Sequence, residues 1–174
     1  MEIPQELKEA IEEVTIGVKH ANLIEQSQKI SEKYRENEGK GKRLVTQETE
    51  AIAYAISRMP ATYCSVYSVL TQVLKNYNKE IKTVFDIGAG TGAATWAIAD
   101  LLDVEKITCL EREKAMRDTG KKLMSKYVEN IEWKECDIVA DKMDEKADLI
   151  ITSYMINELS PVDREKTILK MWET

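Results

Sequence analysis

The chain has 174 residues, of which 43% are hydrophobic and 32% charged, and its formal net charge is −6. This length suits one ordinary domain, or a small domain with an appendage. No apolar run approaches the ~20 residues that cross a bilayer, and the N-terminus lacks the pattern of a signal peptide. We therefore expect a cytoplasmic protein without a membrane partner. The acidic balance argues against a large basic face for nucleic acid.

The cysteines and the single histidine form no pattern typical of a metal site. Cys64, Cys109 and Cys136 are widely spaced and form no C-x-x-C pair, so we interpret them as structural thiols and predict no metal. His20 has no nearby Cys or Asp, and we interpret it as a solvated or half-buried helix position.

Residues 1–80 are predicted to form a helical region. Gly17 interrupts an apolar stripe there, so the first helix is expected to bend or break at that point. We expect the stripe to pack within the chain. It recurs at steps of four and three along one helix face: Leu7, Ile11, Val14, Val18 and Ala21.

A polar segment with two glycines near residues 36–44 is typical of a mobile linker. Its basic cluster, Lys40, Lys42 and Arg43, is either a solvated part of that linker or a contact for phosphates.

Two more helices are predicted before residue 80. One runs from about Gln47 to Arg58, and Pro60 begins the other, because proline suits the first turn of a helix. One face of the second helix is apolar: Tyr63, Val66, Tyr67, Leu70, Val73 and Leu74. Tyr63 therefore either belongs to the core or stacks near a ligand beneath a helical lid.

From about residue 82 the pattern changes to alternating strands and helices. Such alternation predicts a parallel, doubly wound α/β sheet with right-handed crossovers over residues 81–174. Another strand would normally follow the last helix, so we expect the sheet to continue beyond Thr174 or the chain to dimerise over its edge. The expected strands are 83–87, 106–110, 131–135 and 148–152, and the expected helices are 91–102, 112–127 and 162–172.

The segment from Asp86 to Gly92, Asp-Ile-Gly-Ala-Gly-Thr-Gly, lies where the first strand turns into a helix. The glycines Gly88, Gly90 and Gly92 allow a tight turn and let a ligand approach bare backbone. This pattern is shared by dinucleotide sites of the G-x-G-x-x-G/A type, so the glycines alone do not choose a cofactor.

Three acidic residues at successive strand ends favour S-adenosylmethionine over a dinucleotide. Asp86 would repel a pyrophosphate but can accept hydrogen bonds from the ammonium of a methionine moiety. Glu111, about twenty residues past the glycines, can bind ribose hydroxyls in either cofactor class. Asp137 can accept from the adenine amino group, and the N–H of Ile138 can reach a ring nitrogen.

Other interpretations of these acidic residues remain open. Asp86 can serve as a helix cap, and Glu111 can be a surface charge. Glu135 or Asp141 can replace Asp137 if the predicted strand boundary is displaced.

The segment 152–159 follows the fourth strand, which should lie beside the first. Ligands of open α/β sheets sit at such strand ends, so Ser153, Tyr154 and Asn157 are expected to face the methyl group or substrate. Tyr154 and Asn157 are the candidate catalytic residues, although Tyr154 can also be only a pocket wall. The segment lacks the Asn/Asp-Pro-Pro-aromatic motif of amino methyltransferases and a cysteine nucleophile.

Two segments, Arg58-Met59-Pro60-Ala61-Thr62-Tyr63 and 153–159, together with the glycine motif, resemble the methyltransferase-like proteins of the small ribosomal subunit in bacteria and mitochondria. The resemblance covers residue 44 to the C-terminus. It implies a Rossmann-like class I methyltransferase core after an N-terminal helical region, binding of S-adenosylmethionine, and association with small-subunit ribosomal RNA or its assembly. The iron–sulfur cysteine cluster of mitochondrial members has no counterpart here.

Three hypotheses follow. The first is a methyltransferase acting on ribosomal RNA or a ribosomal component. The second is a small-molecule methyltransferase, which a deep apolar pocket above Tyr154 would favour. The third is an assembly factor that binds the cofactor without catalysis, which is compatible with the absence of an identifiable general base in the sequence.

Overall fold

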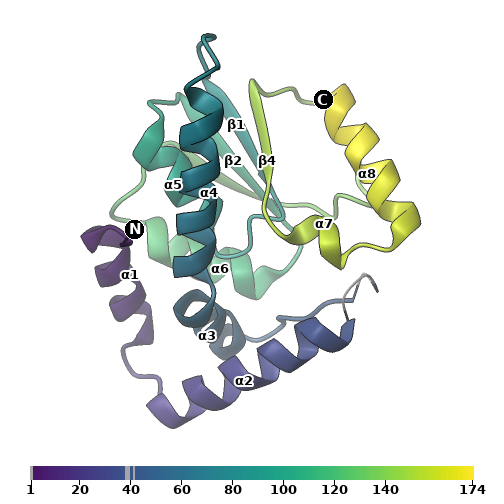
Figure 1. The fold of residues 1–174 in the computed structure, drawn as a ribbon. Helices are drawn as coiled ribbons and strands as arrows, with labels where there is room; N and C mark the ends of the chain where they lie inside the picture. Colours follow the sequence, from purple (N-terminus) through teal and green to yellow (C-terminus); the bar gives the residue numbers. More distant parts are fainter. Residues whose placement is uncertain (1, 38–39, 41) are drawn as a thin grey trace.

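A computed structural model of the chain describes residues 2–37, 40 and 42–174, and it begins with helices (Figure 1). The predicted break is confirmed, because Gly17 has a φ of +84° between α1 and α2. Ala21 is exposed, whereas Val18 still packs against a buried cluster, so the predicted stripe ends between these two residues. Part of the predicted linker, residues 38, 39 and 41, lies outside the described residues. The first four helices are α1 (Gln5–Thr15), α2 (His20–Asn37), α3 (Glu48–Ser57) and α4 (Met59–Leu74).

The predicted parallel sheet is confirmed. In the part of the chain that the structure describes, four parallel strands are arranged in the order β3-β2-β1-β4. β2 and β3 are added on one side of β1 and β4 on the other, so β1 and β4 meet at a topological switch point, where ligands bind in such sheets. The strands are β1 (Thr83–Ile87), β2 (Lys106–Glu111), β3 (Ile131–Glu135) and β4 (Leu149–Thr152).

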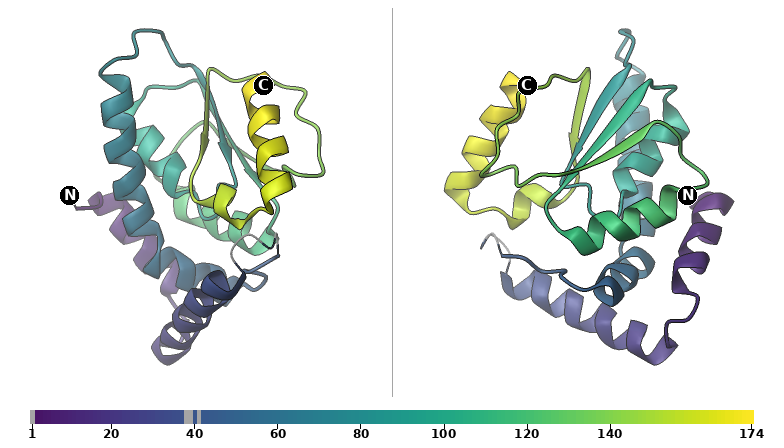
Figure 2. Two further views of the ribbon diagram at one scale, coloured as in Figure 1. Left: turned by 45° about the vertical axis from the view of Figure 1, so that its right-hand side comes forward. Right: turned by 180° about the vertical axis from the view of Figure 1, so that it is seen from behind.

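Helices cover both faces of this sheet, as expected for a doubly wound fold. Figures 1 and 2 place α4 and α5 on one face and α8 on the other. The short helix α7 immediately after β4 was not predicted. The helices of this part are α5 (Ala93–Leu101), α6 (Lys114–Met124), α7 (Met155–Glu158) and α8 (Pro161–Glu173). No helix within the described ranges is long and apolar enough to span a membrane.

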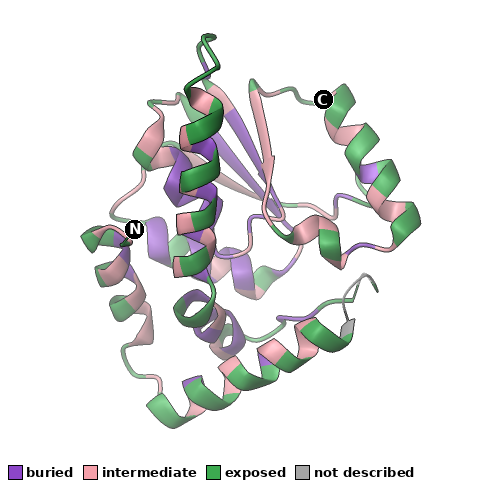
Figure 3. Cartoon of the chain, viewed as in Figure 1, coloured by how far each residue is buried: buried purple, intermediate pink, exposed green. Residues whose placement is uncertain are grey.

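The alternation of side chains along β1 assigns them to two separate cores. Val84 belongs to the cluster that packs under α4 and α5, whereas Phe85 and Ile87 belong to the cluster on the side of α8. β1 and β2 are mostly buried, while α8 is largely exposed (Figure 3). Asp86 must therefore share the α5 face with Val84.

The N-terminal helices pack on the core rather than projecting from it. Leu7 of α1 is fully buried in the main cluster, and Lys126 after α6 forms an ion pair of 2.7 Å with Glu13. Leu23 and Ile30 of α2 pack with Ile52 and Ala53 of α3. The predicted apolar face of α4 is correct at Tyr63, Val66 and Leu70 but wrong at Val73, which is 50% exposed.

We expect Leu7→Ala to destabilise the whole domain. Truncating a fully buried leucine leaves a cavity and costs about 2–5 kcal/mol of the free energy of unfolding. Ile16→Ala is the matched control, because Ile16 at the end of the same helix is 81% exposed and its truncation removes little burial. Urea unfolding of both variants measures the difference; equal stabilities would show that α1 is not part of the cooperative unit.

Candidate cofactor-binding site

The glycine motif folds into a loop whose backbone donors are already used within the protein. The amides of Gly88 and Ala89 donate to the Leu110 carbonyl at 2.8 and 3.2 Å, and the Gly92 amide donates to Ala89. The Gly90 amide donates to Oε2 of Glu111 at 2.8 Å. The loop therefore presents a negative side chain and paired amides where a dinucleotide pyrophosphate would need free N–H groups.

Two of the motif glycines line a pocket and the third does not. Gly90 has a φ of +59°, and a Cβ built there would have no neighbour closer than Met116 at 3.9 Å, so its backbone faces open space. Gly88 lines the same pocket. Gly92 is buried, and a Cβ there would meet Met124 of α6 at 1.8 Å, so this glycine allows close packing of the loop rather than ligand approach.

Glu111 at the end of β2 is the buried carboxylate of this pocket. Its Oε1 accepts from the Glu113 amide at 2.8 Å, while Oε2 accepts from Gly90. Burial raises the pKa of the Glu111 carboxyl above its ordinary value, and these backbone hydrogen bonds oppose the rise. Each oxygen keeps a lone pair, so the carboxylate can accept two further hydrogen bonds from one ligand.

Asp86 does not line the pocket, contrary to the expectation that its carboxylate points there. Strand alternation turns its side chain toward α5, where Oδ2 accepts from the Thr95 amide at 3.1 Å and the Thr95 hydroxyl at 2.7 Å. Full burial raises the pKa of Asp86 to about 6, against the effect of the Thr95 hydrogen bonds. Oδ1 is buried without a hydrogen-bond partner. Asp86 thus fastens the loop to the first turn of α5.

The structure places Asp137 and Ile138 in the same pocket as Gly88, Gly90 and Glu111. Neither alternative to Asp137 lines this pocket. Glu135 is exposed and pairs with Arg117 at 2.6 Å, and Asp141 accepts from the Asp137 amide at 2.8 Å.

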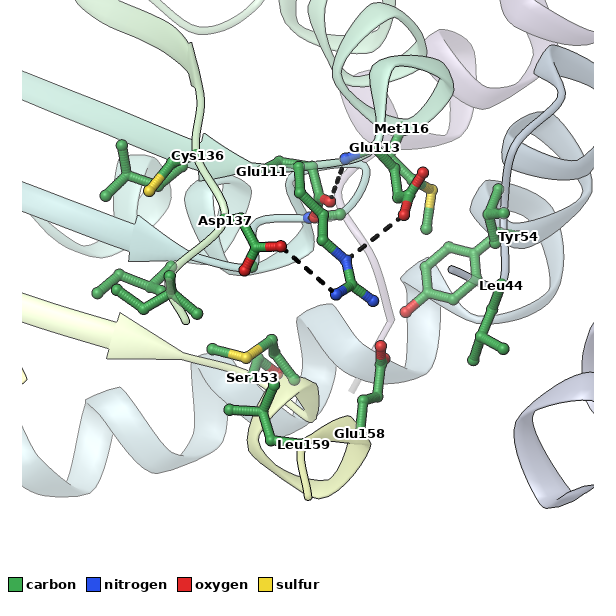
Figure 4. Close-up of a pocket in the computed structure, with 18 of the residues that line it drawn as sticks. Leu44, Tyr54, Glu111, Glu113, Met116, Cys136, Asp137, Ser153, Glu158 and Leu159 are labelled. Atoms are coloured by element: carbon green, nitrogen blue, oxygen red, sulfur yellow. Dashed lines mark hydrogen bonds and ion pairs between the residues drawn. The ribbon is translucent and has the colours of Figure 1, made fainter. Parts of the chain in front are cut away.

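The guanidinium of Arg112 joins the two sides of the pocket. It lies 4.0 Å from Asp137 and 3.4 Å from Glu113, and Figure 4 marks both ion pairs with dashed lines. The guanidinium also donates to the Lys42 carbonyl at 2.8 Å. The basic cluster therefore approaches the pocket, and Arg43 also pairs with Glu113 at 3.7 Å. The cavity that remains is about 70 Å³, room for a few water molecules and too little for a nucleoside. A ligand as large as a nucleoside must displace Arg112 or move the residues on the two sides of the pocket apart.

Sequence reasoning missed two aromatic residues that line this pocket. Tyr34 of α2 and Tyr54 of α3 line it, with ring centroids 6.0 Å apart. Tyr63, the alternative candidate for stacking, is instead 3% exposed, and its hydroxyl donates to Asp100 at 2.6 Å. A lid stacking through Tyr63 is therefore wrong. No local signal separates these tyrosines, since all three occur on helices.

The candidate residues after β4 divide between two cavities. Ser153 lines the pocket of Gly88, Gly90 and Glu111, called the cofactor pocket below. Tyr154 and Asn157 line a neighbouring cavity. Tyr154 has a φ of +65°, unusual for a bulky residue, and its side chain is 59% exposed.

Glu158 lines both cavities, and Figure 4 shows its side chain rising from α7 toward Tyr54. Burial raises the pKa of Glu158 to about 7, and the charge of Glu111 adds to the rise. Glu113 acts in the same direction, whereas Arg112 and a hydrogen bond with Tyr34 oppose it.

We expect Glu158→Gln to stabilise the protein at pH 8. Because the folded-state pKa is raised, the folded protein binds more protons than the unfolded chain between about pH 4.5 and 7, and wild-type stability falls as pH rises through this window. Removing the charge should raise the free energy of unfolding by about 1–3 kcal/mol at pH 8 and change it little at pH 4. Thermal unfolding at both pH values measures this; equal gains at both would contradict it.

The comparisons with known proteins agree with this fold. Residues 48–174 match the model of the family described as mitochondrial small ribosomal subunit Rsm22. Human mitochondrial ribosome assembly protein METTL17 is 22% identical over 133 residues, which are 70% of this chain and 29% of that protein. Carboxy-S-adenosyl-L-methionine synthase of Campylobacter fetus subsp. fetus is 27% identical over 118 residues, 67% of this chain and 50% of that protein. The chain thus spans half or less of these relatives.

Among solved structures, a putative S-adenosyl-L-methionine-dependent methyltransferase from Methanococcus maripaludis aligns with a TM-score of 0.58 and 19% identity. The alignment covers 75% of this chain and 61% of that one, and it shows the class I methyltransferase fold. Since the family model matches most of the chain, from α3 through α8, the chain belongs to the Rsm22 family of the small ribosomal subunit.

Proposed function

We propose that the pocket lined by Gly88, Gly90 and Glu111 binds S-adenosylmethionine. The observation that carries the proposal is the use of the Gly90 amide by Glu111, which leaves a buried carboxylate where two ribose hydroxyls can be bound. Glu113, Asp137 and Glu158 also line the pocket, and Arg112 is the one guanidinium among the described residues that line it. The carboxyl groups outnumber it, so a ligand with a positive charge fits better than one with a pyrophosphate.

The other motif residues have distinct proposed roles. Asp137 accepts from the adenine amino group and the Ile138 amide donates to the ring. Asp86 and Gly92 act indirectly, since they hold the loop against α5 and α6. When bound, S-adenosylmethionine supplies an electrophilic methyl group, and the chain supplies its orientation. Arg112 leaves the centre of the pocket as the cofactor enters.

Calorimetric titration tests this site. We expect S-adenosylhomocysteine to bind in the micromolar range, which corresponds to about −8 kcal/mol, and NADH not to bind. Binding of NADH in preference to S-adenosylhomocysteine would overturn the assignment.

We further propose that the protein acts in the cytoplasm on small-subunit ribosomal RNA or on its assembly. Membership of the Rsm22 family and the similarity to METTL17, named as a mitochondrial ribosome assembly protein, support the ribosomal part of this proposal. We expect the protein to co-sediment with small ribosomal subunits and to be released as salt is raised, because phosphate contacts exchange with counterions. RNA binding that ignored salt would contradict it.

One assay distinguishes a methyltransferase from an assembly factor without catalysis. Transfer of a labelled methyl group to immature small subunits would identify an enzyme, whereas binding of the cofactor and the subunit without transfer would identify an assembly factor. A small-molecule methyltransferase is less well supported, because the cavity beside Tyr154 is lined by two arginines, Glu158 and Asn157 rather than by apolar side chains alone.

A further inference from the structure

A second cavity of about 330 Å³ adjoins the cofactor pocket, a volume within the range of small-ligand sites. Four residues, Tyr34, Leu44, Tyr54 and Glu158, line both cavities. A methyl acceptor must approach the cofactor from such a neighbouring space. The remaining lining residues come from α2, the junction of α3 and α4, α4 itself, the turn between β4 and α7, and α7: Arg35, Arg58, Ala61, Thr62, Tyr154 and Asn157.

Aromatic rings form much of this cavity. Tyr34 and Tyr54 pack against each other, and the guanidinium of Arg58 lies 5.9 Å from the centroid of the Tyr34 ring. Tyr154, on the turn that precedes α7, also lines the cavity and is 59% exposed. Aromatic and guanidinium planes are the surfaces on which unpaired nucleobases stack.

The polar groups of the cavity match the rest of a nucleotide. Arg35 and Arg58 are suited to a phosphate, for which guanidinium groups have the right geometry. Asn157 and Glu158 supply an amide and a carboxyl that can hydrogen-bond the edge of a base.

The backbone at Tyr154 adds an independent sign of function. Its φ of +65° and ψ of −21° lie in the left-handed region, which costs a bulky side chain about 1–2 kcal/mol relative to glycine. Such strain is concentrated at ligand sites, where the side chain is needed in that position. Glycine or asparagine would form the turn at a lower conformational cost, which indicates that the tyrosine ring serves a function there.

We propose that this second cavity holds one unstacked nucleobase of an RNA strand, stacked on Tyr154 and anchored through its phosphate by Arg35 and Arg58. The inference rests on the proposed function and names the acceptor class at the same site. It places the edge of the base between Asn157 and Glu158, on the side shared with the cofactor pocket.

The test uses the full chain in the presence of S-adenosylhomocysteine. The probe is a fluorescein-labelled, unpaired oligoribonucleotide, and its anisotropy reports binding. We expect Tyr154→Ala to weaken binding about ten-fold or more, as for loss of one stacked base, and Tyr154→Phe to keep wild-type affinity. Tyr77→Ala is the control, because Tyr77 follows α4 outside both cavities and is 38% exposed.

Tyr154→Gly separates recognition from folding. It removes the strained side chain, so the melting temperature should stay the same or rise while RNA affinity falls. Competition by nucleoside monophosphates should exceed competition by inorganic phosphate. Equal competition by phosphate, or unchanged RNA affinity in Tyr154→Ala, would overturn the base pocket while leaving S-adenosylhomocysteine binding intact; loss of that binding in the wild-type chain would instead overturn the proposed function.

Discussion

Glu111→Gln is expected to weaken S-adenosylhomocysteine binding by about 100-fold, the effect of losing two charge-assisted hydrogen bonds of 1.5 kcal/mol or more each. Both carboxylate oxygens are held by backbone amides, Gly90 on one side and Glu113 on the other. A glutamine can accept through one oxygen only, and its NH₂ group would face a second donor. The site for two ribose hydroxyls is then lost.

Glu135→Gln is the matched control for this variant. Glu135 ends the neighbouring strand and pairs with Arg117 at the surface, outside the pocket. We expect its affinity for S-adenosylhomocysteine to be that of the wild type. Calorimetry measures both variants, and thermal unfolding checks that each is folded at the titration temperature. Normal binding by folded Glu111→Gln would remove Glu111 from the site.

Gly88→Ala is expected mainly to lower stability and Gly90→Ala mainly to weaken cofactor binding, although their φ values, +68° and +59°, are similar. A Cβ on Gly88 would lie 2.5 Å from Cγ and 2.6 Å from Cβ of Met155, close to the backbone of α7. Overpacking adds to the left-handed strain, so Gly88→Ala should lose about 3 kcal/mol or more of stability.

Gly90→Ala shares the strain but has open space around the new methyl group. We expect it to lose about 1 kcal/mol of stability and to remain folded. Its methyl group points toward the pocket, so the variant should bind S-adenosylhomocysteine at least about ten-fold more weakly. Urea unfolding and calorimetry on both variants test the pair; equal losses of stability would show that Met155 moves aside freely.

The order of strands and helices after residue 82 was predictable because it depends on short-range patterns. The buried strand Thr83–Ile87 and the half-buried strand Ile131–Glu135 are runs of five residues, and the structure has them with the expected bounds. The short helix α7 was missed because four residues carry no periodicity. Val73 was misplaced because it lies at the margin of the apolar face of α4, whereas the next residue, Leu74, still packs against the main cluster.

The candidate site was likewise predictable where it depends on local patterns and not where it depends on packing. The sequence by itself determined the parallel sheet, the glycine loop and the acidic residues at its strand ends, since parallel strands bring their carboxyl ends to one edge. Only the tertiary structure decided which atoms face the pocket. Side-chain alternation within β1 turns Asp86 to α5. Packing of α2 on α3 and of α3 on α6 brings Tyr34 and Tyr54 to pocket residues more than thirty positions away. Local patterns specify the elements, whereas long-range packing specifies their contacts.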